Sequence, residues 1–115
     1  AGGPRTRLLH GTNAHHSLPR AAWLLGLPEP VPVPAPAGTL DPAALDDALA
    51  RLPGPALVAA TAGTTDAGLI DPLPDIADTC DRHGARLHID AAYGGGLLFS
   101  DRRRTHLAGL DRAHT

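Results

Sequence analysis

Three short polar motifs in this sequence carry side chains that could do chemistry. They are His15-His16-Ser17, Gly63-Thr64-Thr65 and His88-Ile89-Asp90, and each lies beside the end of an apolar, strand-like segment. Open α/β sheets bind their ligands at the carboxyl ends of parallel strands. If the three segments are neighbouring parallel strands, the motifs meet at one edge of the sheet and form a single site.

Asp90 is the residue on which this site depends most. Apolar and polar side chains alternate over residues 87–90, which predicts a strand with one apolar face and with His88 and Asp90 on the other. A carboxylate in this position is costly to bury unless a cation meets it. The small residues at 91–96 predict space for a flat ligand against the backbone. The plain alternative is an aspartate that caps a turn before a flexible glycine loop.

Several kinds of site fit these residues less well. His88 and Asp90 share a strand face and are good metal ligands, but the metalloprotease pattern of two histidines four apart on a helix is absent. A Ser-His-Asp hydrolase would need a Gly-x-Ser-x-Gly elbow, which is also absent. The triple glycine at 94–96 lacks the spacing of a dinucleotide-binding fingerprint. We therefore expect no metal ion at this site.

A cationic, ring-shaped cofactor suits the polar groups better. An aspartate at a strand end can keep a pyridinium nitrogen protonated, and a protonated pyridine ring is the electron sink that stabilises a carbanion in pyridoxal phosphate chemistry. An imidazole can stack on such a ring, and a threonine hydroxyl can donate to ring substituents or to a substrate carboxylate. The residues alone thus favour a pyridine cofactor without identifying the reaction.

Composition limits what else the protein can be. A chain of 115 residues with a formal net charge of −2 forms one domain and gives no reason to expect nucleic acid or an anionic membrane as a partner. No apolar run is long enough to span a bilayer. Cys80 is the only cysteine, which excludes a disulfide framework and favours a reducing, cytoplasmic setting.

The segments that must position the motifs alternate between strand and helix. Asp41-Pro42 and Asp71-Pro72 are typical of helix starts with an aspartate N-cap. The first helix is expected to bury Leu18, Ala21, Ala22 and Leu25. The expected order is strand 5–10, helix 15–25, a proline-rich edge strand or linker at 28–38, helix 41–52, strand 56–61, helix 71–83, strand 85–90, and short elements at 97–100 and 105–113. This alternation predicts a parallel α/β architecture.

Longer stretches around the motifs resemble a known protein family. They are residues 14–22 (AHHSLPRAA), 60–72 (ATAGTTDAGLIDP) and 87–95 (LHIDAAYGG). In their order and approximate spacing they resemble the group II pyridoxal-phosphate-dependent amino acid decarboxylases, among them the aromatic amino acid, glutamate and diaminobutyrate decarboxylases. The resemblance covers nearly the whole chain. It implies an α/β fold in which residues 1–115 are part of the parallel-sheet large domain of a fold-type I enzyme, incomplete at both ends.

The resemblance also implies roles for individual residues. His15 would stack on the ring of pyridoxal 5′-phosphate and help to protonate the intermediate or to position the substrate, which makes it the candidate catalytic residue. Thr65 would lie beside the ring or the substrate carboxylate. Asp90 would pair with the pyridinium nitrogen, and Ala92 would pack on the ring face opposite His15.

Two further residues, His88 and Asp71, match family positions near the site, and the resemblance gives them supporting roles. Structural alternatives exist for several of these assignments. Without the family, His15 is a residue at a helix start near solvent, Thr65 caps a turn, and Asp71 is an N-cap. His16 stands where the family is variable, so we favour His15 of the two histidines.

One family feature is missing from this chain. In the family the cofactor forms a Schiff base with a lysine that follows a histidine, and all ten basic residues here are arginine. Through the resemblance we expect this chain alone to be inactive and poorly folded, and its parent protein to be a homodimeric carboxy-lyase that decarboxylates an amino acid. The alternatives are an aminotransferase or a cysteine desulfurase of the same fold type, or a non-catalytic truncated remnant.

Overall fold

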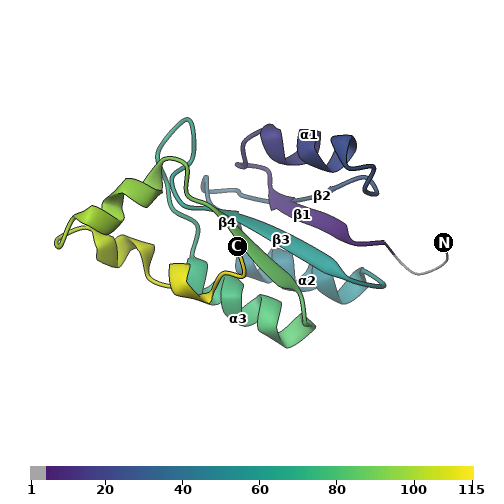
Figure 1. Ribbon diagram of the computed structural model, residues 1–115. Helices are drawn as coiled ribbons and strands as arrows, with labels where there is room; N and C mark the ends of the chain where they lie inside the picture. Colours follow the sequence, from purple (N-terminus) through teal and green to yellow (C-terminus); the bar gives the residue numbers. More distant parts are fainter. Residues whose placement is uncertain (1–4) are drawn as a thin grey trace.

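The structure of the protein is a computed structural model, and it describes residues 5–115. Four parallel strands form one sheet in the order β2-β1-β3-β4, with bounds β1 (Arg7–Gly11), β2 (Val31–Val33), β3 (Ala56–Thr61) and β4 (Arg86–Asp90). Three helices cover the sheet, α1 (Ser17–Leu24) on one face, α2 (Pro42–Arg51) and α3 (Leu73–His83) on the other (Figure 1). The predicted alternation of strands and helices in an α/β fold is confirmed.

The hydrophobic core follows from this layering. β3 is an inner strand, and its residues Val58, Ala59 and Ala60 are all buried because helices cover both sides of it. This explains why the strand is a continuous apolar run rather than an alternating one. The proline-rich segment supplies β2, which is the edge strand, as predicted. A proline is tolerated there because an edge strand needs fewer ladder hydrogen bonds.

Helices α2 and α3 supply the larger cluster on their side of the sheet. Asp41 caps α2 as predicted, because its side chain accepts a hydrogen bond from the Ala43 backbone at 3.1 Å. The apolar face predicted for α3 is buried, and it consists of Leu73, Ile76, Ala77 and Cys80. Gly84 ends α3 in the left-handed conformation at φ 65°, which glycine adopts without strain.

The first helix differs from its prediction. It begins at Ser17 rather than at residue 15 and ends at Leu24. Ala22 is buried as expected, but Ala21 is exposed and Leu25 is 72% exposed. The reason is that the chain turns at Gly26 and brings Leu27, in place of Leu25, against the sheet. Apolar side chains of this helix end therefore face outward.

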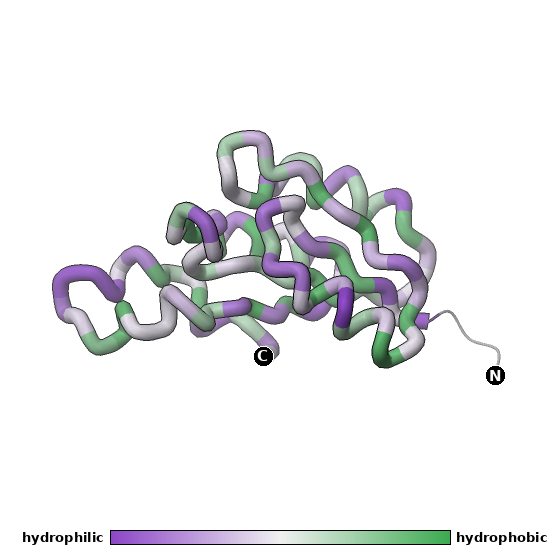
Figure 2. Tube along the Cα trace, turned by 90° about the horizontal axis from the view of Figure 1, so that it is seen from above, coloured by the Kyte–Doolittle hydropathy of each residue, from purple (hydrophilic) through white to green (hydrophobic). Residues whose placement is uncertain are grey.

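Beyond β4 the chain extends from the end of the sheet. The predicted short elements are three 3₁₀ helices, Gly94–Phe99, Arg104–Leu107 and Leu110–Arg112. The first two project to one side of the sheet (Figure 1), and the tip of this projection is hydrophilic (Figure 2). The third, Leu110–Arg112, lies against α3. Thr115 returns to β4, where it accepts from the Ile89 N–H at 3.0 Å. Within residues 5–115 no helix is both long and apolar enough to cross a bilayer.

Candidate active site

The three polar motifs converge at the carboxyl ends of β1, β3 and β4, as the parallel arrangement predicts. A cleft of about 370 Å³ opens there, which we call the strand-end cleft. Its walls are His15, Ser17, Thr61, Gly63, Thr65, Asp90, Ala92 and Tyr93. The cleft therefore brings together the four residues that the sequence assigns to cofactor binding, and His88 and Asp71 lie outside its walls.

Asp90 ends β4 with one carboxylate oxygen engaged and one open. Its side chain is half-buried, and Oδ1 accepts a hydrogen bond from the Ala92 backbone N–H at 3.1 Å. Within residues 5–115 no hydrogen bond reaches Oδ2 and no basic side chain pairs with Asp90. A partly buried carboxylate with an open oxygen is suited to a ligand that brings a cationic N–H.

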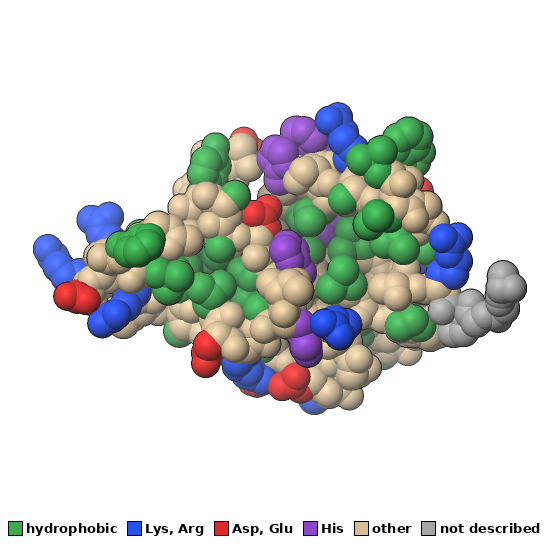
Figure 3. All heavy atoms as spheres, viewed as in Figure 1, with side chains coloured by type: hydrophobic (Ala, Val, Ile, Leu, Met, Phe, Trp, Pro, Cys, Tyr) green, Lys and Arg blue, Asp and Glu red, His purple; other side chains and the backbone are tan. Residues whose placement is uncertain are grey.

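His15 lies in the loop between β1 and α1 and lines the cleft from there. Its Nδ1 accepts a hydrogen bond from the Ser17 backbone N–H at 3.2 Å and lies 2.9 Å from Ser17 Oγ. The neighbouring His16 ring is 4.0 Å from the His15 ring between centroids, but His16 is exposed and is not part of the cleft wall. Figure 3 shows histidine side chains at intervals across this face, from the α1 layer toward the α3 layer.

The loop after β3 presents Thr65 to the cleft. Gly63 begins the loop at φ 99°, a left-handed conformation that favours glycine. Thr64 is buried and its hydroxyl accepts from the Leu69 backbone N–H at 3.0 Å, which closes the loop on itself. Thr65 is exposed and lines the cleft. The structural alternative for Thr65 was that its side chain stabilises a turn. In the structure it is Thr64 that makes this contact.

Sequence reasoning missed Thr61. It ends β3, lies in register with Asp90 on β4, and is 4% exposed. Its hydroxyl is buried without a hydrogen-bond partner in the part of the chain that the structure describes. A buried hydroxyl normally has a partner. The signal in the sequence was a single polar residue at the end of an apolar strand, directly before the Gly-Thr-Thr loop.

The prediction that Asp71 is a helix N-cap is wrong. The residue that caps α3 is Pro72, and no side chain caps this helix. Asp71 is instead 2% exposed, and its carboxylate accepts three hydrogen bonds. The donors are the Leu40 N–H at 2.8 Å and Asn13 Nδ2 at 2.9 Å on Oδ1, and the Thr61 N–H at 2.8 Å on Oδ2. Asp71 therefore joins three loops behind the cleft.

Of the small residues expected to leave space for a ligand, Ala92 lines the cleft, but the space at Gly94 is filled by the protein itself. Gly94 donates its N–H to the Ala62 carbonyl at 2.8 Å. A Cβ on Gly94 would lie 2.3 Å from that oxygen, so this glycine permits two backbone segments to touch. Gly96 has open space around its Cα, and its segment is helical rather than a loop. Gly94 therefore allows the segment after β4 to pack closely against the segment after β3.

His88 lies two residues before Asp90 on β4. Its Nδ1 is 3.0 Å from Thr115 Oγ1, and it does not line the cleft. Within residues 5–115 no cluster of three or more His, Cys, Asp or Glu side chains is arranged to hold a metal ion.

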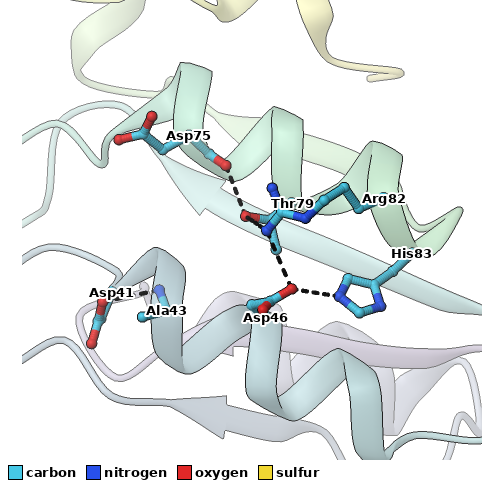
Figure 4. Close-up of polar contacts among 7 residues, drawn as sticks. All are labelled: Asp41, Ala43, Asp46, Asp75, Thr79, Arg82 and His83. Atoms are coloured by element: carbon cyan, nitrogen blue, oxygen red, sulfur yellow. Dashed lines mark hydrogen bonds and ion pairs between the residues drawn. The ribbon is translucent and has the colours of Figure 1, made fainter.

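Other hollows in the molecule offer less chemistry. One has about 450 Å³ and is lined mainly by residues 68–74, with His106 and Ala108. Another lies between α2 and α3, where Asp46 accepts from His83 at 2.6 Å and from Arg82 at 3.2 Å (Figure 4). These bonds, the one from His83 first, lower the pKa of Asp46 below its usual range. The strand-end cleft is the hollow that combines an open carboxylate, an imidazole and an unpartnered hydroxyl.

The family model described as the pyridoxal-dependent decarboxylase conserved domain matches residues 5–115. The chain belongs to the pyridoxal-dependent decarboxylase family. This confirms the family that the sequence motifs resemble.

Individual members of the decarboxylase family are similar over most of this chain. L-2,4-diaminobutyrate decarboxylase of Rhizobium meliloti (strain 1021) is 44% identical over 94% of this chain and 23% of that protein. The crystal structure of mouse CSAD in its apo form has a TM-score of 0.89 at 39% identity, over 96% of this chain and 25% of that one. Oryza sativa TDC, crystallised with PLP and tryptamine, has a TM-score of 0.86 at 31% identity, over 95% and 25%.

This chain thus spans about a quarter of the length of the relatives it matches. The likenesses confirm that its parallel sheet has the architecture of the fold-type I decarboxylases. The roles of His15, Thr65, Asp90 and Ala92 remain predictions that the geometry of the cleft accommodates.

Proposed function

We propose that this chain is part of the cofactor-binding large domain of an amino acid decarboxylase that uses pyridoxal 5′-phosphate. The full-length protein of which it would be a part is called the parent protein below. The proposal rests above all on one observation, which is that His15, Thr65, Asp90 and Ala92 all line the same cleft. Within residues 5–115, the Asp90 carboxylate in this cleft has an open oxygen and no basic partner. Family membership supplies the reaction class.

The donor set of the cleft fits a pyridine ring. Asp90 would hold the ring nitrogen through its open Oδ2, because a carboxylate accepts from a cationic N–H. His15 and Ala92 would bound the two ring faces. The hydroxyl of Thr61 has no hydrogen-bond partner within residues 5–115, and it would donate to an oxygen substituent of the ring. Thr65 would contact the ring edge or the substrate.

Pyridoxal 5′-phosphate, when bound, supplies an electron sink for the carbanion that remains after loss of the α-carboxylate. Asp90 keeps a proton at the ring nitrogen, because its negative charge favours the cationic form. His15 holds the substrate or delivers a proton to it from the opposite wall. The Gly94 N–H donates to the Ala62 carbonyl and so joins the segments that follow β3 and β4. The chain has no lysine, so covalent attachment of the cofactor would need a lysine elsewhere in the parent protein.

We also propose an amino acid as substrate, a homodimeric parent and a cytoplasmic location. The names of the relatives support the amino acid. Trp23, Leu24 and Leu25 are 70–77% exposed here, and an apolar group of this size is typical of a surface that another part of the assembly covers. The single buried cysteine supports a reducing compartment. Light scattering of the purified parent and cell fractionation would decide the last two points.

The reaction is tested by release of carbon dioxide from a panel of amino acids by the parent protein with pyridoxal 5′-phosphate. We expect turnover of at least one amino acid. Asp90→Ala should lower kcat/KM about a hundredfold, since loss of a partly buried ionic partner costs about 3 kcal/mol. Asp66→Ala is the matched control, because Asp66 is exposed and forms no ion pair within residues 5–115. The 115-residue chain alone should release none.

Two results would overturn the proposal. One is a parent protein that binds the cofactor and converts amino acids only by transamination or desulfuration. The other is an Asp90→Ala protein that matches the Asp66→Ala control in both cofactor affinity and turnover.

A further inference from the structure

The contact between His15 and Ser17 fixes where the imidazole carries its proton. A backbone N–H can only donate, so the 3.2 Å bond from the Ser17 N–H requires a lone pair on His15 Nδ1. A neutral imidazole that accepts at Nδ1 has its proton on Nε2. The Ser17 hydroxyl, 2.9 Å from the same nitrogen, then acts as a second donor. The two bonds also restrict rotation of the ring.

The start of α1 explains why this arrangement forms. Ser17 is the first residue of the helix, and its N–H is among the donors that no helix carbonyl can satisfy. The N-cap residue, His16, makes no side-chain cap bond. The imidazole of His15, the residue before the N-cap, instead accepts the hydrogen bond from the Ser17 N–H. The conformation of the helix start and the tautomer of His15 are therefore coupled.

We propose that Ser17 is a positioning residue that holds His15 as the Nε2–H tautomer, so that His15 offers the cleft a hydrogen-bond donor. Both residues line the cleft, and no group among residues 5–115 bonds Nε2. The relevance to a substrate rests on the proposed function, because it requires that the cleft be the decarboxylase site. The tautomer itself does not depend on that function.

The donor matters because of what faces it. A carboxylate can only accept hydrogen bonds, so Nε2–H attracts it, whereas the lone pair of the other tautomer would repel it. Asp90 across the cleft offers the opposite polarity, since its open oxygen can only accept. The cleft thus has an acceptor wall at β4 and a donor wall at His15. This polarity matches a ligand with a cationic nitrogen at one end and a carboxylate at the other.

The first test is the ¹⁵N NMR spectrum of the parent protein labelled at histidine alone. His15→Gln identifies the signals of His15 by their loss. We expect a pyridine-like shift for Nδ1 and a pyrrole-like shift for Nε2 in the neutral form. A pyrrole-like Nδ1 would overturn the proposal whether or not the protein is a decarboxylase.

The second test uses a matched pair of variants in the parent protein. Ser17→Thr keeps the hydroxyl and Ser17→Val replaces it with a methyl group of the same shape. We expect Ser17→Val to lower kcat/KM for the amino acid about fivefold, the equivalent of one hydrogen bond of about 1 kcal/mol, and to leave cofactor affinity within about twofold. Ser17→Thr should restore most of the rate. Ser100→Ala, away from the cleft, should leave it unchanged.

The two variants also separate the possible outcomes. Equal rates in Ser17→Val and Ser17→Thr, with an unchanged His15 spectrum in both, would overturn the positioning role of the Ser17 side chain, because both variants keep the backbone N–H that donates to Nδ1. A parent protein without decarboxylase activity would refute the proposed function, while the NMR shifts of His15 in the same two variants would still decide the tautomer.

Discussion

The two aspartates that precede a proline give the sharpest test of the structure. Asp41 and Asp71 stand in the same local sequence, Asp-Pro, and both match the pattern of a helix N-cap. In the structure only Asp41 caps its helix, with an exposed contact to Ala43, while Asp71 is buried and accepts three hydrogen bonds. Replacement of each by asparagine should separate the two roles, because asparagine caps a helix about as well as aspartate.

The cost of Asp71→Asn can be worked out from its partners. All three partners are donors, so the asparagine oxygen can keep the Leu40 and Asn13 bonds but its NH₂ group then faces the Thr61 N–H. One bond to a charged acceptor is lost, worth about 2 kcal/mol, and two buried donors are left unpaired. Relief of the buried charge offsets part of this. The expected net cost of opening the loops is about 3 kcal/mol.

Hydrogen exchange of the parent protein, read residue by residue by mass spectrometry, measures this cost locally. A change of 3 kcal/mol corresponds to exchange about a hundredfold faster at the amides of Leu40 and Thr61. In Asp41→Asn the same amides should exchange at the wild-type rate, and the Ala43 amide should change less than about threefold. If Asp71→Asn and Asp41→Asn are indistinguishable at Leu40 and Thr61, the buried role of Asp71 is wrong.

Three further predictions follow from single contacts. Burial raises the pKa of the Cys80 thiol to about 11, so its reaction with a disulfide reagent at mildly alkaline pH should be about a hundredfold slower in the folded than in the unfolded protein. Gly94→Ala should destabilise the protein by about 2 kcal/mol in thermal unfolding, because its Cβ meets the Ala62 carbonyl, whereas Gly96→Ala should be nearly neutral. The pKa of Asp46 is lowered, so its hydrogen bonds stabilise the fold above about pH 4. This stabilisation is lost as the pH falls through the pKa of Asp46 in the folded protein. The difference in free energy of unfolding between wild type and Asp46→Asn should therefore shrink from pH 7 to pH 3.

The order of elements could be predicted because its signals are local. The apolar run at 56–61 and the helical period at 73–80 each lie within one element, and the structure places strand and helix there. The convergence of the three polar motifs required only one more rule, that parallel strands end on the same side. Local periodicity failed at Leu25, where eight residues of helix are too few to decide which apolar side chain turns inward.

The errors have a common physical origin in contacts between segments far apart in the sequence. The donors to Asp71 include Asn13 and Leu40, which are 58 and 31 residues away. Gly94 is small because it touches the backbone at Ala62, on a different strand loop. The sequence next to Asp71 or Gly94 therefore contains no pattern that indicates these distant contacts. Thr61 was overlooked for the same reason, since its isolation is visible only when its surroundings are known.

The contrast between Asp71 and Asp90 explains how the fold assigns different chemistry to two aspartates at loop ends. Three N–H groups converge on the Asp71 carboxylate, so its charge is stabilised by hydrogen bonds and it needs no cation. Asp90 receives one N–H and retains an oxygen that faces the cleft. The two carboxylates therefore differ in how many hydrogen-bond donors reach them within residues 5–115: three for Asp71 and one for Asp90. Asp71 holds the loops in place, and we propose that Asp90 attracts a cationic group of a ligand.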